Sequence, residues 1–282
     1  GARSGGADHD TRRNRGRPVS PGPPQPDRRP PSPPSSVALF AGCIAELATP
    51  APAQAAIRVL EAMGTTVAFP EAQSCCGQPA LNSGFPRASE RLARHWLTTF
   101  EAYEAVVSPS GSCVAHLHHQ VPRTLPGAWA SRAADLAART WEFSQFVAAY
   151  GEGLPLRLEA TVCVHDSCHM LRSLGERTSV RRVLGRIEGL AIEEMTDPET
   201  CCGFGGTFAA KFPDVSVAMA DAKLADGRGT GATWLVSADP GCLLHLQGRA
   251  DWRGLPVRTR HLAEVVADAL PTAVPLTQSA AT

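Results

Sequence analysis

The tripeptide Cys-Cys-Gly occurs twice in this chain, and each copy is framed by two further cysteines at nearly matched distances. The two sets are Cys43, Cys75, Cys76 and Cys113, and Cys168, Cys201, Cys202 and Cys242. Four thiolates in a repeated frame are typical of a metal site occupied by an iron–sulfur cluster or zinc. The ninth cysteine, Cys163, lies in an apolar alternation without a counterpart in the first half, so we expect it in the core.

Length and charge limit the classes of protein to which the chain can belong. The chain has 282 residues, enough for two domains, and its 27 basic and 27 acidic residues give a net charge of zero. We therefore expect no nucleic-acid binding. The sequence contains no apolar run long enough to predict a membrane span, and it shows no secretory signal. Long apolar segments beside nine cysteines favour a reducing cytoplasm with metal-bound thiolates over a secreted disulfide framework.

Composition and periodicity divide the chain into three parts. Residues 1–36 are rich in Pro, Arg and Gly and predict a disordered tail. Residues 37–156 and 157–282 then show the same order of elements, which predicts a first and a second domain of one kind. The division indicates an internal duplication.

Each half shows three apolar runs separated by helical periodicity. We expect strands at 37–40, 66–69, 105–107, 161–165, 190–194 and 233–236. Helices are predicted at 52–63, 86–103, 170–184 and 214–226, and in a segment containing Trp141, Phe143, Phe146 and Val147. The pattern predicts an α/β fold of two duplicated βαβαβ units, each with a small parallel sheet flanked by helices.

The cysteines follow the predicted strands. Because parallel strands end at one edge of a sheet, where α/β proteins bind ligands, we expect each set to converge. The outer cysteines of each set stand at the start of predicted helices, which lowers the pKa of a thiol. Gly77 and Gly203 are predicted to adopt positive φ or to let backbone N–H groups approach cluster sulfides, and Gly205-Gly206 could extend that cradle.

Four stretches carry a resemblance to a known family: residues 75–84, 107–113, 165–169 and 201–208. From about Val37 to Leu270 the chain resembles the cysteine-rich CCG domain family. That family includes the cysteine-rich subunit of heterodisulfide reductase and the iron–sulfur subunits of glycolate oxidase and anaerobic glycerol-3-phosphate dehydrogenase. Within it, the resemblance is greatest to the lactate utilisation A (YkgE-type) group.

This resemblance implies a cytoplasmic iron–sulfur electron-transfer subunit of a bacterial complex that oxidises L-lactate to pyruvate. The implied partners are other lactate utilisation subunits, including a ferredoxin-like iron–sulfur protein, and an electron acceptor. The alternatives are a subunit of another hydroxy-acid or glycerol-3-phosphate dehydrogenase, or of a heterodisulfide reductase-like enzyme. No flavin or nicotinamide fingerprint occurs, so we expect the substrate chemistry on a partner or at an open cluster position.

The chain departs from the wider family at one position in each half. The family pattern ends in Cys-x-x-Cys, and the first of these positions is Ser110 in one half and Asp239 in the other. A missing fifth thiolate favours two ordinary [4Fe–4S] clusters over the fused cluster of heterodisulfide reductase. Whether Ser110 or Asp239 touches a cluster stays open.

Histidines near the cysteines are further candidates. His116, His118 and His119 follow Cys113 closely, and His165 precedes Cys168; we interpret these four as surface or satisfied histidines. Beside Cys168, Asp166 and His169 are better candidates for a ligand or a proton carrier.

Two other classes of function compete with the iron–sulfur interpretation. A structural zinc protein with two Cys₄ sites is disfavoured because adjacent cysteines are awkward ligands for one tetrahedral ion. A thiol–disulfide oxidoreductase using the vicinal pairs does not explain Cys43 and Cys113.

Overall fold

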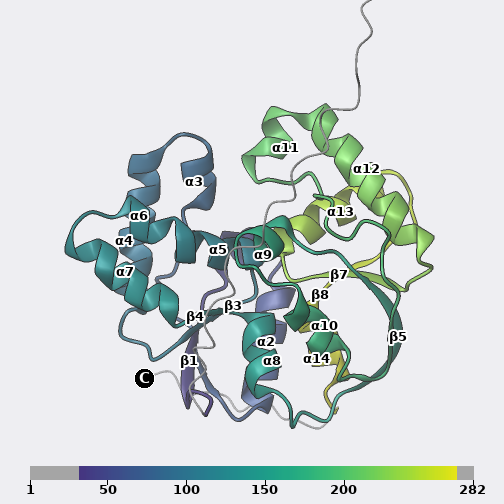
Figure 1. Cartoon of the computed structure of the whole chain (residues 1–282), viewed down its shortest axis with the longest axis horizontal. Helices are drawn as coiled ribbons and strands as arrows, with labels where there is room; N and C mark the ends of the chain where they lie inside the picture. Colours follow the sequence, from purple (N-terminus) through teal and green to yellow (C-terminus); the bar gives the residue numbers. More distant parts are fainter. Residues whose placement is uncertain (1–31, 272–282) are drawn as a thin grey trace, which may run out of the picture.

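A computed structural model of the chain describes residues 32–271. Most of the predicted tail, residues 1–36, and the last 11 residues of the predicted second domain lie outside the described residues. Two α/β halves stand side by side, each built on its own parallel sheet (Figure 1).

The first half has a four-stranded parallel sheet in the order β2-β1-β3-β4. Its strands are β1 (Ser36–Leu39), β2 (Thr66–Ala68), β3 (Val106–Ser108) and β4 (Thr140–Glu142). Its helices are α1 (Gly42–Leu47), α2 (Ala51–Ala62), α3 (Gln78–Asn82), α4 (Pro86–Phe100), α5 (Gly111–His119), α6 (Val121–Thr124), α7 (Ala128–Ala138) and α8 (Phe143–Tyr150).

The second half repeats this arrangement in the order β6-β5-β7-β8, again with every neighbouring pair parallel. Its strands are β5 (Arg157–Val164), β6 (Glu188–Ile192), β7 (Trp234–Ser237) and β8 (Thr259–His261). Its helices are α9 (Cys168–Arg172), α10 (Thr178–Leu184), α11 (Thr207–Lys211), α12 (Pro213–Gly229), α13 (Pro240–Trp252) and α14 (Leu262–Ala269).

The duplicated α/β fold is confirmed, and three details differ from the sequence prediction. Each sheet has a fourth strand, β4 or β8, that was not predicted. Trp141 lies in β4, so the helix predicted around it begins only at Phe143. The helix predicted over 170–184 is two helices, α9 and α10, separated by a segment in which Gly175 has a φ of 65°. Left-handed backbone at that glycine ends the first helix.

Strands β1, β3 and β7 and the last three residues of β5 are almost wholly buried because helices cover both faces of each sheet. In β1, Val37 and Leu39 face one core cluster, whereas Ala38 faces another together with Phe40. This alternation follows the two-residue period of a strand.

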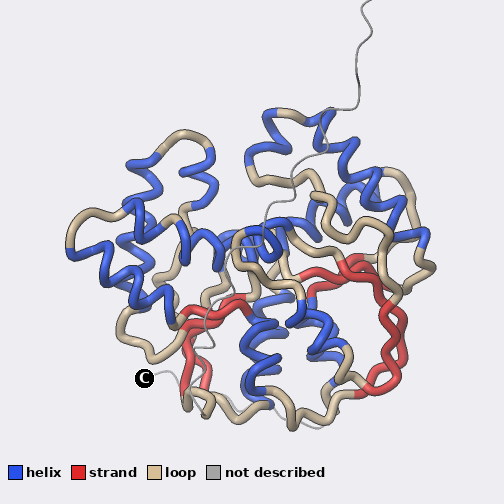
Figure 2. The backbone as a smooth tube through the Cα atoms, in the orientation of Figure 1, coloured by secondary structure: helices blue, strands red, loops and turns tan. Residues whose placement is uncertain are grey.

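One core is shared between the two halves. Helices α2 and α8 of the first half and α10 and α14 of the second pack between the two sheets (Figures 1 and 2). Two smaller clusters lie on the outer faces, under α4, α5 and α7 on one side and under α12 and α13 on the other. Among residues 32–271, every helix is too short or too polar to cross a membrane.

A buried carboxyl group at the end of β4 should make the stability of the fold depend on pH. Glu142 is 0% exposed and accepts a hydrogen bond from the Ser144 amide at 2.7 Å, capping α8. Burial raises its pKa to about 8, although the bonds from Ser144 oppose that shift. In the unfolded chain the pKa is about 4.3.

Between these two pKa values the folded chain holds a proton that the unfolded chain has lost. The free energy of unfolding should therefore fall as pH rises from about 4.5 to 8 and then level off. Glu142→Gln should remove this part of the slope. Urea midpoints of both proteins across this range measure it, and parallel curves would show that Glu142 titrates normally.

Candidate metal centre

The eight set cysteines lie beyond the carboxyl ends of the strands, as predicted from their positions in the sequence. In the first half, Cys43 lies in α1 after β1, Cys75 and Cys76 follow β2, and Cys113 lies in the first turn of α5 after β3. The equivalents Cys168, Cys201, Cys202 and Cys242 follow β5, β6 and β7 in the same way. Strand order reverses between β1 and β3 and between β5 and β7, which is where doubly wound sheets bind ligands.

Sulfur atoms of the first set are in mutual contact. The Sγ atoms of Cys43 and Cys75 are 3.6 Å apart, and the Gly77 amide donates to Cys75 Sγ at 3.4 Å. Hydrogen bonds from the Cys43 and Cys76 thiols lower the pKa of Cys75 to about 3. The hydrogen bond to Cys75 raises the pKa of Cys43, and those to Cys113 and Cys75 raise that of Cys76. Within this set, Cys75 is therefore the cysteine most inclined to the thiolate form.

The second set repeats this pattern. The Gly203 amide donates to Cys201 Sγ at 3.4 Å, and hydrogen bonds from Cys168 and Cys202 lower the pKa of Cys201 to about 2. Those same contacts with Cys201 raise the pKa values of Cys168 and Cys202. All nine cysteines of the chain are free thiols. A thiolate is the form that binds metal, so both sets are prepared for ligation.

The glycine of each Cys-Cys-Gly is held in left-handed backbone conformation. Gly77 has a φ of 95° and Gly203 a φ of 92°. Gly205 and Gly206 also have positive φ, at 50° and 63°. This geometry turns each loop so that its amide points at the first cysteine of the vicinal pair.

Both sets face one cavity between the halves. All set cysteines except Cys75 line it. Polar contacts cross between the halves around it: the Ser112 amide donates to Asp239 Oδ2 at 2.8 Å, and the side chains of Gln78 and His169 meet at 3.1 Å. The two sites therefore lie close together across the interface of the halves.

Ser110 and Asp239, at the substituted family positions, cap helices. Both are buried, and Ser110 Oγ accepts from the Cys113 amide at 3.4 Å. Asp239 Oδ1 accepts from the Gly241 amide at 3.2 Å, while its Oδ2 accepts from Ser112. Their oxygens bind the N-termini of α5 and α13, where N-cap side chains satisfy amides that lack helical partners.

The neighbours of Cys168 have different roles. Asp166 is buried and pairs with Arg181 at 2.7 Å and with Arg177 at 3.4 Å, which fixes the loop after β5. His169 lines the cavity, with its Nδ1 3.6 Å from Cys168 Sγ. Cys163 is 1% exposed in β5, a core residue as predicted.

The histidines that follow Cys113 have different surroundings in the structure. His118 bonds to the Thr140 carbonyl oxygen through Nε2 at 2.8 Å. His116 is only 2% exposed, so its interpretation as a surface or satisfied histidine does not hold: burial lowers its pKa to about 4, and its Nε2 has no hydrogen-bond partner among the described residues.

A second duplicated motif beneath the Cys-Cys-Gly loops was missed. The pattern Phe-Pro-x-x-Ser occurs at 85–89 and at 212–216, opening α4 and α12. Ser216 Oγ donates to the Gly203 carbonyl at 2.8 Å and contacts His245 Nε2 at 3.1 Å. Its counterpart, Ser89, is buried against Gly77. The repeat itself was the signal that could have revealed these residues.

Comparison with known proteins agrees with this geometry. Residues 37–118 and 162–247 each match the CCG family, described as a cysteine-rich domain. The chain therefore belongs to the CCG cysteine-rich domain family.

Proteins of similar sequence point to one group within this family. Lactate utilization protein A of Halalkalibacterium halodurans is 44% identical over 82% of this chain and 96% of its own length. The protein of that name from Bacillus cytotoxicus is 39% identical over 82% and 98%. The chain is thus a homologue of lactate utilization protein A.

A solved structure shares the fold. The crystal structure of a hypothetical protein from Helicobacter pylori matches 84% of this chain with a TM-score of 0.60 at 11% sequence identity. The chain spans about half of that protein, 49% of its length.

Proposed function

We propose that this chain is an iron–sulfur electron-transfer subunit in the oxidation of L-lactate to pyruvate, with one [4Fe–4S] cluster in each half. The observation that carries the proposal is the convergence of two four-cysteine sets on one cavity at the strand ends. The halves, residues 37–156 and 157–282, would each contribute one set.

The residues fit the group. Each set offers four thiol sulfurs, the number that a [4Fe–4S] cluster takes from protein. The lowered pKa values of Cys75 and Cys201 favour the thiolate form that binds iron, and each sulfur accepts a backbone N–H. Helix N-termini at α5 and α13 partly offset the negative charge of thiolate-bound iron. Adjacent cysteines suit the separate iron corners of a cluster better than one tetrahedral zinc.

Lactate is proposed from the relatives' name and from the chemistry of the site. Oxidation of L-lactate to pyruvate releases two electrons and two protons, and two one-electron centres match that number. The sequence holds no nicotinamide or flavin fingerprint, so a partner would oxidise lactate. We propose as partners the other lactate utilisation subunits, including a ferredoxin-like protein, in the cytoplasm.

Anaerobic mixing experiments test this assignment. The visible absorption of the purified chain should persist with L-lactate alone and bleach when the partner subunits are added. Glycolate and glycerol 3-phosphate are the matched control substrates. Bleaching by one of these instead of L-lactate would favour the alternative dehydrogenases.

A further inference from the structure

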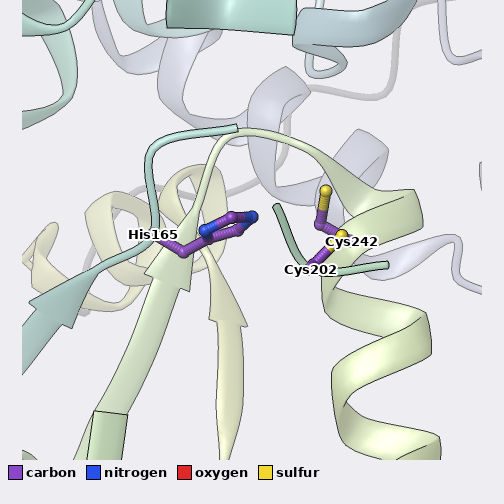
Figure 3. A group of neighbouring side chains, drawn as sticks. All are labelled: His165, Cys202 and Cys242. Carbon is purple, nitrogen blue, oxygen red and sulfur yellow. The ribbon is translucent and has the colours of Figure 1, made fainter. Parts of the chain in front are cut away.

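His165 occupies a place in the second set that has no equivalent in the first. It follows β5, three residues before Cys168, and its ring lies beside Cys202 and Cys242 (Figure 3). One ring nitrogen of His165 and the Sγ atoms of both cysteines lie within 4.8 Å of one another.

The ring of His165 lacks the partners that a buried imidazole needs. It is 2% exposed, and neither ring nitrogen has a hydrogen-bond partner among residues 32–271. A neutral imidazole carries one N–H, and leaving such a buried donor unpaired is costly. The backbone that carries the ring is held in place, because the N–H of His165 bonds to the Val236 carbonyl at 2.8 Å and its carbonyl accepts from Ser237 Oγ at 3.0 Å.

The other polar groups around this set are already engaged. Both oxygens of Asp239 accept backbone N–H groups, and Ser167 Oγ lies 3.5 Å from Asp239 Oδ2. Asp166 is paired with Arg181. His165 is therefore the unsatisfied group that faces the sulfurs of the second set.

The first half has Phe40 at the corresponding position, three residues before Cys43. Phe40 is 1% exposed and packs edge-on against Phe100, with ring centroids 5.5 Å apart. A phenyl ring cannot donate a hydrogen bond. The duplication thus preserves the thiols and changes the group beside them.

We propose that His165 donates its ring N–H to a sulfur of the second site and thereby raises the reduction potential of that site. This inference rests on the proposed function, in that each set holds a cluster. A hydrogen bond to a cluster sulfur stabilises the extra negative charge of the reduced form, and such bonds help to set cluster potentials.

The test is an anaerobic redox titration followed by electron paramagnetic resonance, with iron and sulfide measured on every sample. The unmodified chain should show two potentials. His165→Phe, which copies the first half, should keep its iron and lower the potential of the second site, identified as the one that is lost in Cys202→Ser. His165→Gln keeps an N–H and should retain most of the wild-type value. Cys163→Ala, a buried change in the same strand, controls for loosening of β5 and should shift neither potential.

Several outcomes would overturn the proposal. Unchanged potentials in an iron-loaded His165→Phe protein would contradict the proposed hydrogen bond but leave the proposed function standing. An unmodified chain that contains no iron and no sulfide would contradict both proposals. Pulsed resonance on the unmodified chain with ¹⁵N-histidine needs no variant. Weak nitrogen coupling supports a hydrogen bond, and strong coupling would instead show nitrogen bound to iron.

Discussion

Gly203→Ala should lower the free energy of unfolding by about 3 kcal/mol and empty the second cysteine set. Left-handed backbone costs an alanine about 1–2 kcal/mol. A Cβ at this position would lie 2.5 Å from the backbone carbonyl oxygen of Ser216, and overpacking of this kind costs about 1–3 kcal/mol. Relief requires the loop to move, which also moves the amide that donates to Cys201.

A matched glycine separates the two causes. Gly64 has a φ of 81°, and a Cβ there would meet nothing within 4 Å. Gly64→Ala should therefore cost only the backbone term, about 1–2 kcal/mol, with full iron content. Urea unfolding and iron analysis of both variants measure the difference. Equal losses of unfolding free energy and of iron in the two variants would show that the close approach of Gly203 to α12 contributes to neither.

Cys202→Ser should remove about half of the iron, and Cys76→Ser the other half, because the proposed function gives each set a cluster of its own. Both cysteines are 2% exposed, at the buried centre of their sets. The double variant should bind no iron. Cys163→Ser lies outside the sets and should keep the full amount, which controls for damage to the fold.

The shared cavity makes the opposite result informative. All set cysteines except Cys75 line one space. Loss of all iron from either single variant would therefore indicate one cluster bridging the halves. Iron and acid-labile sulfide per chain, measured after anaerobic purification, distinguish the two arrangements.

The placement of the cysteines at the strand ends could be predicted from sequence because the motif is local and repeated. The Cys-Cys-Gly loops follow short apolar strands, and parallel strands bring their ends to one edge. The positive φ of Gly77 and Gly203 followed from the same reasoning, since few other residues adopt that conformation.

Other features depend on contacts between distant segments. Strands β4 (Thr-Trp-Glu) and β8 (Thr-Arg-His) are short and mostly polar, so they lack the apolar run that marked the other strands. The core shared by α2 and α14 joins residues some 200 positions apart, which no local pattern encodes. The bond from the Ser112 amide to Asp239 Oδ2 forms only when the two halves meet.

The most direct test of the central claim is the metal content of the unmodified chain after anaerobic purification. We expect a brown protein with about eight iron atoms and about eight sulfides per chain, as two [4Fe–4S] clusters require. A colourless protein that contains zinc and no sulfide would contradict the account.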